Sequence, residues 1–267
     1  MSRKKQITLV SYNPEWPQQF EAERVQIAKA LTGNCTAIHH IGSTAIPGLS
    51  AKPRIDIIIE SPRPKEAIRP LESLGFEYMG EFNIPFHYGF RRRTGVEVNL
   101  HMYEPGHPEI ALNLTFRDYL LKNPYVRDEY QEYKLELLSK EDAAEKGLCK
   151  LSNYSARKGY LIRRTLEEAD FYTPRITILS DDYEWDYVNM QEKIEDRCTP
   201  YPSPRHIYCM FYAGGEIVGY TYITKLSPEK YKIKRVFIEF EWQKQKNEFV
   251  TLVEKWIASK QHAPQKS

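Results

Sequence analysis

The sequence predicts an α+β protein of two domains, and three observations lead to this fold class. Segments with helical spacing alternate with short apolar segments over the first 170 residues. One of them, Ile55 to Ile59, is an apolar run with a single acid, which is typical of a central strand buried on both faces. The composition changes at residues 170–175, after which strand patterns dominate. We therefore expect a mixed sheet with flanking helices over 1–170 and a smaller α/β domain over 171–267.

The elements of the first domain follow from apolar periodicity and from helix-breaking residues. Apolar residues at helical spacing run from Phe20 to Leu31, and Gly33 ends this helix. Pro124 fits the first turn of a later helix, because its missing N–H needs no partner there. In order, we predict a strand over 7–10, a helix over 20–31, strands over 35–41 and 55–59, a helix over 64–74, strands over 76–78, 88–92 and 96–102, and helices over 112–121, 124–138 and 150–169.

The second domain is predicted from apolar alternation and from a glycine turn. Gly214-Gly215 lies between two apolar segments and indicates a β-hairpin. The predicted elements are strands over 176–179, 207–212, 217–223 and 232–240 and helices over 185–194 and 248–258. This order gives a small antiparallel sheet with helices.

Composition excludes several classes of protein. The 267 residues are 41% hydrophobic and 28% charged, and a net charge of +2 gives no overall signal for nucleic-acid binding. No apolar run approaches the ~20 residues that span a membrane, and no apolar region follows the basic N-terminus as in a secretory signal. The four cysteines form no CxxC pair, which argues against a zinc site or a disulfide framework. We expect a reduced, cytoplasmic protein that does not bind membranes.

One glycine-containing stretch predicts the functional site. Gly42-Ser43 opens an irregular loop with two prolines, and the buried strand with Asp56 follows. A glycine-serine turn lets backbone N–H groups approach phosphate oxygens, and basic residues steady phosphates. A strand carboxylate can hold Mg²⁺. The candidate phosphate- or anion-binding residues are Gly42, Ser43, Thr44, Lys52 and Arg117.

This stretch and its surroundings resemble the GrpB family. The resemblance rests on Val10-x-Tyr12-x-Pro14-x-Trp16-Pro17, on the segment from His40 to Asp56, and on Phe116-Arg117-Asp118-Tyr119-Leu120. It covers roughly residues 7–170. Because the family is grouped with the polymerase-β-type nucleotidyltransferase superfamily, the resemblance implies a small mixed sheet flanked by helices. The implied ligand is a nucleotide or another phosphorylated small molecule, with Mg²⁺ as the cofactor of a nucleotidyl transfer.

The superfamily pattern has two acids at positions i and i+2 of the strand, and this sequence has one. Arg54 and Ile58 occupy the two positions that share a face with Asp56. Glu97, on the later predicted strand over 96–102, is the candidate second metal ligand beside Asp56. His101 on the same predicted strand is a candidate catalytic residue together with Asp56. A nucleotidyltransferase and a catalytically inactive binding or regulatory protein therefore both stay open.

Structural roles are the alternatives for the same residues. Asp56 could pair with Lys52 or Arg117 instead of a metal. Histidines such as His101 are more often hydrogen-bonded scaffold than ligands. Lys134 and Lys158 lie on predicted helices and could face the same cleft, although a solvated helix face is the default for lysine.

The second domain resembles the central part of a GNAT-type acetyltransferase. Residues 216–223 after the glycine turn match the central hairpin of that fold, and Gln243 matches the start of its CoA-pyrophosphate turn. Lys246 and Glu248 stand where small residues would allow close backbone approach. We expect a truncated module that does not bind acetyl-CoA, so N-acetyl transfer is the third and least favoured function. Its unpaired sheet edge predicts packing on the first domain or a homodimer through this domain.

Overall fold

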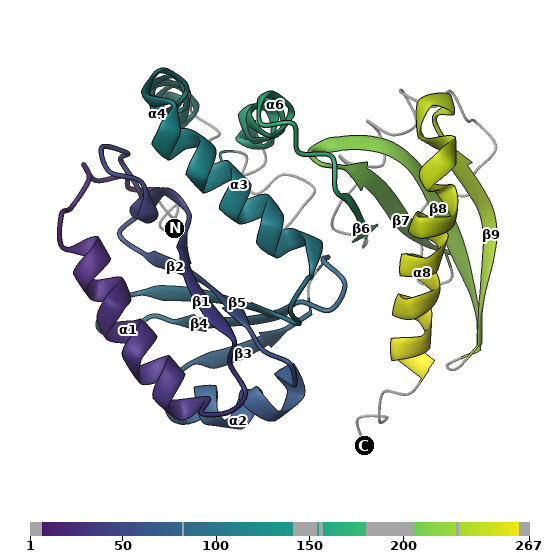
Figure 1. The fold of residues 1–267 in the computed structure, drawn as a ribbon, viewed down its shortest axis with the longest axis horizontal. Coiled ribbons are helices and arrows are strands. Elements are labelled where there is room, and N and C mark those ends of the chain that lie inside the picture. Colours follow the sequence, from purple (N-terminus) through teal and green to yellow (C-terminus); the bar gives the residue numbers. More distant parts are fainter. Residues whose placement is uncertain are drawn as a thin grey trace, which may run out of the picture.

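The chain folds into two sheets, each with its own helices (Figure 1). The computed structural model describes residues 7–81, 83–140, 154, 157–179, 206–227 and 230–261. Within these ranges no helix is long and apolar enough to cross a bilayer. The two sheets and the helices that accompany them confirm the predicted α+β class. The predicted helix over 185–194 and most of residues 150–156 lie outside the described residues.

The first sheet is mixed, with strand order β1-β2-β5-β4-β3. Strands β2 and β5 are parallel, and the other neighbours are antiparallel. The elements are α1 (Trp16–Ala30), β1 (Ala37–Ile41), the 3₁₀ turn η1 (Ser43–Ala45), β2 (Ile55–Glu60), α2 (Pro64–Ser73), β3 (Glu77–Gly80), β4 (Tyr88–Arg92), β5 (Val98–Tyr103), α3 (Pro108–Lys122), α4 (Pro124–Ser139) and α6 (Gly159–Glu168).

Several predicted bounds differ from the structure; α1, for example, begins at Trp16 and not at residue 20. The strand over 7–10 is only an isolated bridge between Val10 and Ala51. Helix α3 begins four residues earlier than expected, because Pro108 fits its first turn and the His107 ring accepts the Glu109 N–H at 3.3 Å. A histidine ring in place of a serine or aspartate cap gives no clear signal in the sequence.

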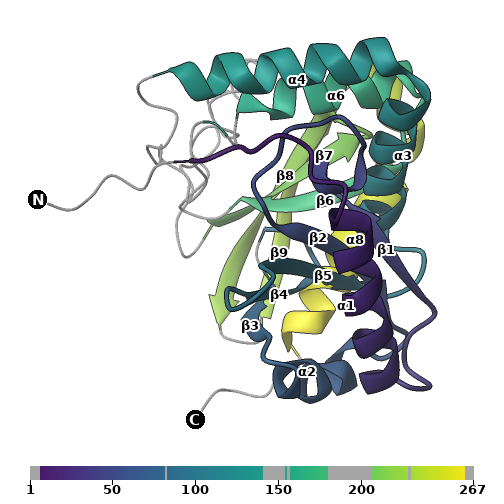
Figure 2. The ribbon, with the colours of Figure 1, turned by 90° about the vertical axis from the view of Figure 1, so that its left-hand side faces the viewer.

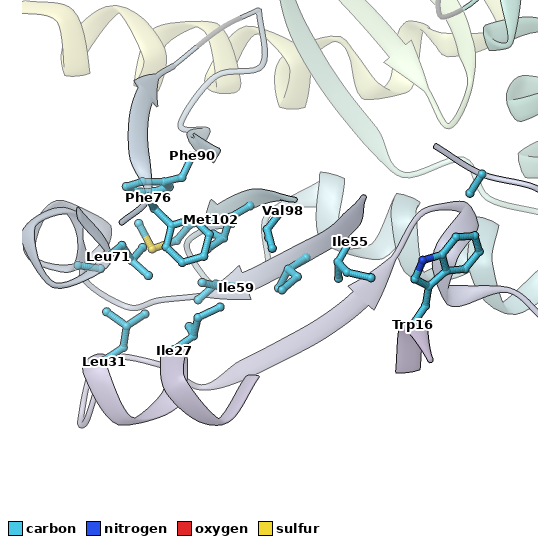
Figure 3. Close-up of a cluster of buried hydrophobic side chains, with 14 residues drawn as sticks. Trp16, Ile27, Leu31, Ile55, Ile59, Leu71, Phe76, Phe90, Val98 and Met102 are labelled. Carbon is cyan, nitrogen blue, oxygen red and sulfur yellow. The ribbon is translucent and has the colours of Figure 1, made fainter. Parts of the chain in front are cut away.

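Alternate residues of β2 point to different faces of the sheet. Ile55, Ile57 and Ile59 pack against α1 and α2, where Ile27 and Leu71 join the main core (Figure 3). Ile57, Ile58 and Ile59 have no exposed surface, which confirms a central strand buried on both faces. Asp56 and Ile58 face the other side, toward α3. This second face, which also carries polar residues of β5, is where the site lies.

Helices α3, α4 and α6 form a layer beside the site. Leu120, Tyr130 and Leu161, one from each helix, share one apolar cluster with Ile46 and Leu49 of the loop after η1. Helices α4 and α6 lie next to each other in both views of the ribbon (Figures 1 and 2). The loop that follows Gly42 is therefore attached to a helical layer as well as to the sheet.

The second sheet is antiparallel, with strand order β6-β7-β8-β9. Its elements are β6 (Pro174–Leu179), β7 (His206–Ala213), β8 (Glu216–Ser227), β9 (Lys230–Ile238), the 3₁₀ turn η2 (Phe240–Gln245) and α8 (Lys246–Gln261). Phe211 of β7 stacks on Phe249 of α8 with ring centroids 4.9 Å apart. Gly214 has φ +57°, which confirms the predicted glycine hairpin. Helix α8 therefore covers one face of this sheet.

We predict that Ile57→Ala lowers the free energy of unfolding by about 2–5 kcal/mol, because it removes a fully buried side chain from a core with little freedom to collapse. Urea unfolding followed by circular dichroism measures this. Val25→Ala, at a side chain that is 54% exposed on α1, is the control and should change the value by less than about 0.5 kcal/mol. Equal effects of the two changes would contradict the described core.

Candidate functional site

The backbone turn at Gly42 lies directly on the side chain of Asp56. Gly42 has φ +70° and ψ −174°, a conformation that is essentially restricted to glycine. A Cβ atom at this position would lie 2.6 Å from Oδ2 of Asp56. On its other side, Asp56 Oδ1 accepts a hydrogen bond of 2.7 Å from Asn99 Nδ2. The glycine is therefore required by the carboxylate beneath it, and the two residues fix the start of the loop together.

Helix α4 holds the two ends of the loop from Ser43 to Ser50. Lys134 Nζ donates to the Ser50 carbonyl at 2.5 Å and to Ser43 Oγ at 3.3 Å. The Gln131 side chain accepts the Ser50 N–H at 2.9 Å and donates to Ser50 Oγ at 2.7 Å. Lys134 is only 1% exposed. The Lys134 side chain therefore links the two ends of the loop by hydrogen bonds from a single buried nitrogen.

Thr44 and Arg117 have structural contacts on the opposite side of the turn. Thr44 is 1% exposed, and its Oγ1 lies 3.0 Å from Nε2 of His40. Arg117 donates to the His40 carbonyl at 2.8 Å and to Asp118 at 2.7 Å. His40 itself stacks on Phe20, and burial together with the charge of Arg117 lowers its pKa to about 4. These residues connect β1 to α1 and α3.

Three lysines gather beside the turn, and we call Lys52, Lys134 and Lys158 the lysine cluster. Lys134 lies over the ring of Tyr130, 5.1 Å from its centroid, and Lys158 lies over Tyr154 at the same distance. Tyr130 and Lys134 have i, i+4 spacing on α4, which places them on one helix face, whereas Lys158 directly precedes α6. Lys52 is also 5.2 Å from the Tyr154 centroid. The Tyr154 ring therefore joins the loop to the helical layer.

Among the described residues, Asp56 is the carboxylate whose charge acts on the lysine cluster. Burial and the charge of Lys158 lower the pKa of Lys134 to about 7. Burial and the charge of Lys52 lower the pKa of Lys158 to about 8, while Asp56 opposes this shift. Burial and the charge of Arg54 likewise lower the pKa of Lys52, again against Asp56. The site thus combines mutually repelling cations with too little negative charge to balance them.

Glu97, the predicted second metal ligand, forms an ion pair with Arg54. Arg54 donates two hydrogen bonds to Glu97 Oε2, at 2.7 Å and 3.0 Å. Arg93 donates to Asn99 Oδ1 at 2.6 Å. No three His, Cys, Asp or Glu side chains in the described part of the chain are grouped so that they could hold a metal ion. Asp56 and the Asn99 amide, with Glu97 already paired with Arg54, lie among the cationic side chains of Lys52, Lys134, Lys158, Arg54 and Arg93, and such a set does not fit a Mg²⁺ site.

His101 lies on the same face of the sheet as Asp56. In the β2–β5 register, Asp56 is opposite Asn99 and Ile58 is opposite His101. His101 Nδ1 lies 3.0 Å from Nε2 of His87. Burial lowers the pKa of His101, and the charge of Asp56 works in the opposite direction. A neutral imidazole therefore faces the polar side of the sheet.

The structure brings part of the predicted site together. Gly42, Ser43, Lys52 and Asp56 meet at the turn, and His101 shares their face of the sheet. Thr44, Arg117 and Glu97 have the scaffold contacts described above. Residues that we did not select from the sequence also contribute: Asn99, Arg93, Tyr130, Tyr154, and the two helix lysines for which solvation was the default. The repeated Tyr-x-x-x-Lys spacing, at Tyr130 and Lys134 of α4 and at Tyr154 and Lys158 before α6, is the signal that could have identified the lysines.

Comparison with known proteins assigns a family to the first domain. The family model described as GrpB protein matches residues 6–168, and the region after it has no family assignment. UPF0157 protein YqkA of Bacillus subtilis is 37% identical over 142 residues, which are 50% of this chain and 40% of that protein. UPF0157 protein BH1888 of Halalkalibacterium halodurans is 30% identical over 61% of this chain and 83% of its own length.

A solved structure supports the same assignment. The crystal structure of conserved protein GrpB from Enterococcus faecalis matches with a TM-score of 0.51 and 29% identity. The match covers 60% of this chain and 98% of the Enterococcus chain. The chain therefore shares sequence and fold with proteins of this kind over its first domain, although it spans less than half the length of YqkA.

We predict that Gly42→Ala destabilises the protein more than Gly95→Ala does, by at least about 1 kcal/mol. Both glycines have positive φ, +70° and +66°, but a Cβ at Gly95 meets no atom within 4 Å. A side chain at Gly42 additionally meets the Asp56 carboxylate. Urea unfolding of the two variants measures the difference. Equal losses would show that the contact between turn and carboxylate does not constrain the fold.

Proposed function

The chain belongs to the GrpB family, and we propose that its first domain binds a phosphorylated small molecule or a nucleotide through the lysine cluster. The observation that carries this proposal is the convergence of Lys52 and Lys158 on the Tyr154 ring, with Lys134 beside them on Ser43 and the Tyr130 ring. Among the described residues, Asp56 is the carboxylate whose charge acts on this cluster. The ligand's phosphate would lie beside Ser43, whose hydroxyl already contacts Lys134.

The energetics of the cluster support an anionic ligand. Burying like charges together is unfavourable, which is why the lysine pKa values fall. A bound phosphate would offset that repulsion and accept charge-assisted hydrogen bonds from the ammonium groups. Proteins retain such perturbed groups most often at functional sites. The glycine turn itself carries less of the proposal, since Gly42 is needed to accommodate Asp56.

The proposal does not include metal-dependent nucleotidyl transfer. Asp56 is hydrogen-bonded to Asn99, and Arg54 stands at the neighbouring position on the same face of the strand. Nucleotidyl transfer remains a prediction from the family resemblance, and the experiment below separates it from binding alone.

In the described part of the second domain, no contact favours acetyl transfer. Gln243 donates to the Ile238 carbonyl at 2.7 Å, so it closes the end of β9. Among the described strands, β9 is at the edge of the sheet. Acetyl-CoA binding and a homodimer through this domain stay predictions from the resemblance.

We predict that Lys158→Met and Lys52→Met each weaken binding of pyrophosphate or ADP about 10-fold to 100-fold, because each removes a charge-assisted interaction of about 1.5–3 kcal/mol. Isothermal titration calorimetry with phosphate, pyrophosphate, ADP and ATP measures this, with EDTA or with Mg²⁺. Lys65→Met, at an exposed lysine on α2, is the control and should bind like the wild type. Wild-type protein that binds none of these anions, or variants that bind as well as it does, would contradict the proposal.

Asp56→Asn separates the two functions in the same titration. If the site binds anions without metal, removing the negative charge should preserve or strengthen binding. If Asp56 holds Mg²⁺ under a nucleotide, the same change should abolish binding that depends on Mg²⁺. The second result would replace the present proposal by nucleotidyl transfer.

We predict that anion binding is accompanied by proton uptake near pH 7.5. Lys134 and Lys158 have pKa values lowered to about 7 and about 8, so part of the cluster is neutral at this pH. A nearby anion raises both pKa values, and the lysines then take up protons from the buffer. Calorimetry with sulfate, which does not titrate in this range, in buffers of different ionisation enthalpy measures the uptake. It should disappear at pH 5.5, where the lysines are already charged.

A further inference from the structure

The connection between β3 and β4 contacts the second domain. Within this connection, residues 81 and 83–87 are described, and we call them the docking segment. The Asn83 carbonyl accepts the backbone N–H of Ile178 in β6 at 2.7 Å. Glu81 forms an ion pair with Lys260 of α8. The side chain of Phe86 packs on the core between α8 and the second sheet. A loop of the first domain is thus part of the second domain's packing.

The last residue of the docking segment, His87, points back into the first domain. Its ring is stacked with those of His101 and Tyr103, at centroid distances of 5.1 Å and 5.2 Å. Its Nε2 lies 3.0 Å from Nδ1 of His101. A Cβ atom on Gly89 would lie 2.9 Å from Cε1 of His87. The glycine therefore provides the room in which His87 lies over the strand and against His101.

A second contact attaches the same segment to the start of α3. His107 Nε2 donates to the Pro85 carbonyl at 2.9 Å, because its Nδ1 accepts the Glu109 N–H. Glu109 in turn pairs with Arg175 of β6 at 3.0 Å, and both side chains are largely buried, with 7% and 13% exposed. The docking segment, α3 and β6 thus meet in one polar junction.

The backbone of the docking segment is held in an unfavourable conformation. Phe86 has φ +59°, which a bulky side chain rarely adopts. Its N–H donates to Glu81 Oε1 at 2.6 Å, and its partly buried ring packs against the second domain's core. Such a conformation persists only where surrounding contacts impose it. The contacts that impose it here come in part from the second domain.

We propose that the second domain positions His101 in the candidate site, and that it acts through the docking segment and His87. The contacts form a continuous path from β6 and α8 to the docking segment, from there to His87, and from His87 to His101 on the face that carries Asp56. Loosening the domain contact releases Phe86 from its strained conformation and withdraws the partner that orients the His101 ring. In this arrangement the His87 ring orients the His101 ring, and the geometry of His101 can be measured without any ligand.

Side chains do not completely fill the junction between the domains. A cavity of about 40 Å³ lies there, and Phe86, His107, Arg175 and Leu252 are among the residues that line it. Unfilled volume at an interface forgoes contacts that would otherwise hold it closed. Changes on the second domain's side should therefore loosen docking without unfolding either core.

The test uses full-length variants altered only in the second domain's contacts with the docking segment. Lys260→Gln removes the ion pair to Glu81, and Leu252→Ala enlarges the cavity. Lys255→Gln, at an exposed lysine of α8, is the matched control. Amide hydrogen exchange at Ile178 and Phe86 reports docking. Long-range ¹H–¹⁵N spectra of protein labelled at histidine report the tautomers of His87 and His101, assigned with His87→Asn and His101→Asn.

We expect exchange at Ile178 and Phe86 to be about tenfold faster in Lys260→Gln and Leu252→Ala, with shifted signals for His87 and His101. His39 of β1, which pairs with Glu60 of β2, should keep its signal, and Lys255→Gln should match the wild type. Faster exchange with unchanged His87 and His101 signals would overturn the inference. If neither variant loosens docking, native-state exchange in low denaturant decides. The histidine signals must then change at the denaturant concentration that opens the Ile178 amide, and a change only at global unfolding overturns the inference.

The same variants also separate this inference from the proposed function. Pyrophosphate affinity measured on them shows whether His101 geometry affects the ligand site. A wild-type protein without anion affinity would contradict the proposed function, while the histidine result would still decide the domain coupling.

Discussion

The contact between the Gly42 backbone and the Asp56 carboxylate is the constraint on which the site depends. It sets the direction in which the chain leaves β1, and the loop can then return to β2 only across α4. Lys134 and Gln131 hold that return at Ser50. Lys52 follows two residues later and reaches Tyr154 as a consequence. A carboxylate in the middle of an otherwise apolar strand thereby organises about a dozen residues and a layer of helices.

Charge distinguishes this site from a metal centre with similar surroundings. The strand position two residues before Asp56 holds Arg54, which needs Glu97 as its own partner. A divalent cation would thus meet Asp56 alone, among side chains that repel it. An anion meets three ammonium groups whose mutual repulsion it relieves. The same backbone frame can therefore serve opposite ligand charges, and the side chains at three or four positions decide which one it accepts.

The sequence allowed much of the fold to be predicted, because the strongest signals are local. The apolar run from Ile55 to Ile59, the helix after Asn123 and the Gly214-Gly215 hairpin all agree with the structure. The early start of α3 could not be predicted, since it depends on a histidine ring acting as a cap. The site was harder to predict from the sequence than the fold. Gly42 was interpreted as room for a phosphate, whereas the room is taken by Asp56, a residue fourteen positions away.

The lysines illustrate why a site resists prediction from a single chain. Lys134 lies on α4 and Lys158 directly precedes α6, and only the packing of α4 and α6 over the loop brings them to Lys52. The docking segment presents the same difficulty across domains, because Phe86 and His87 belong to the first domain in sequence while the partly buried Phe86 ring packs against the core of the second. A boundary drawn at residue 170 therefore divides the sequence into two parts, but side chains of the two parts pack together across it. A fragment that ends there would uncover the Phe86 ring and would remove part of the restraint on its strained backbone, so the first domain's own stability depends in part on residues beyond the end of the family match at residue 168.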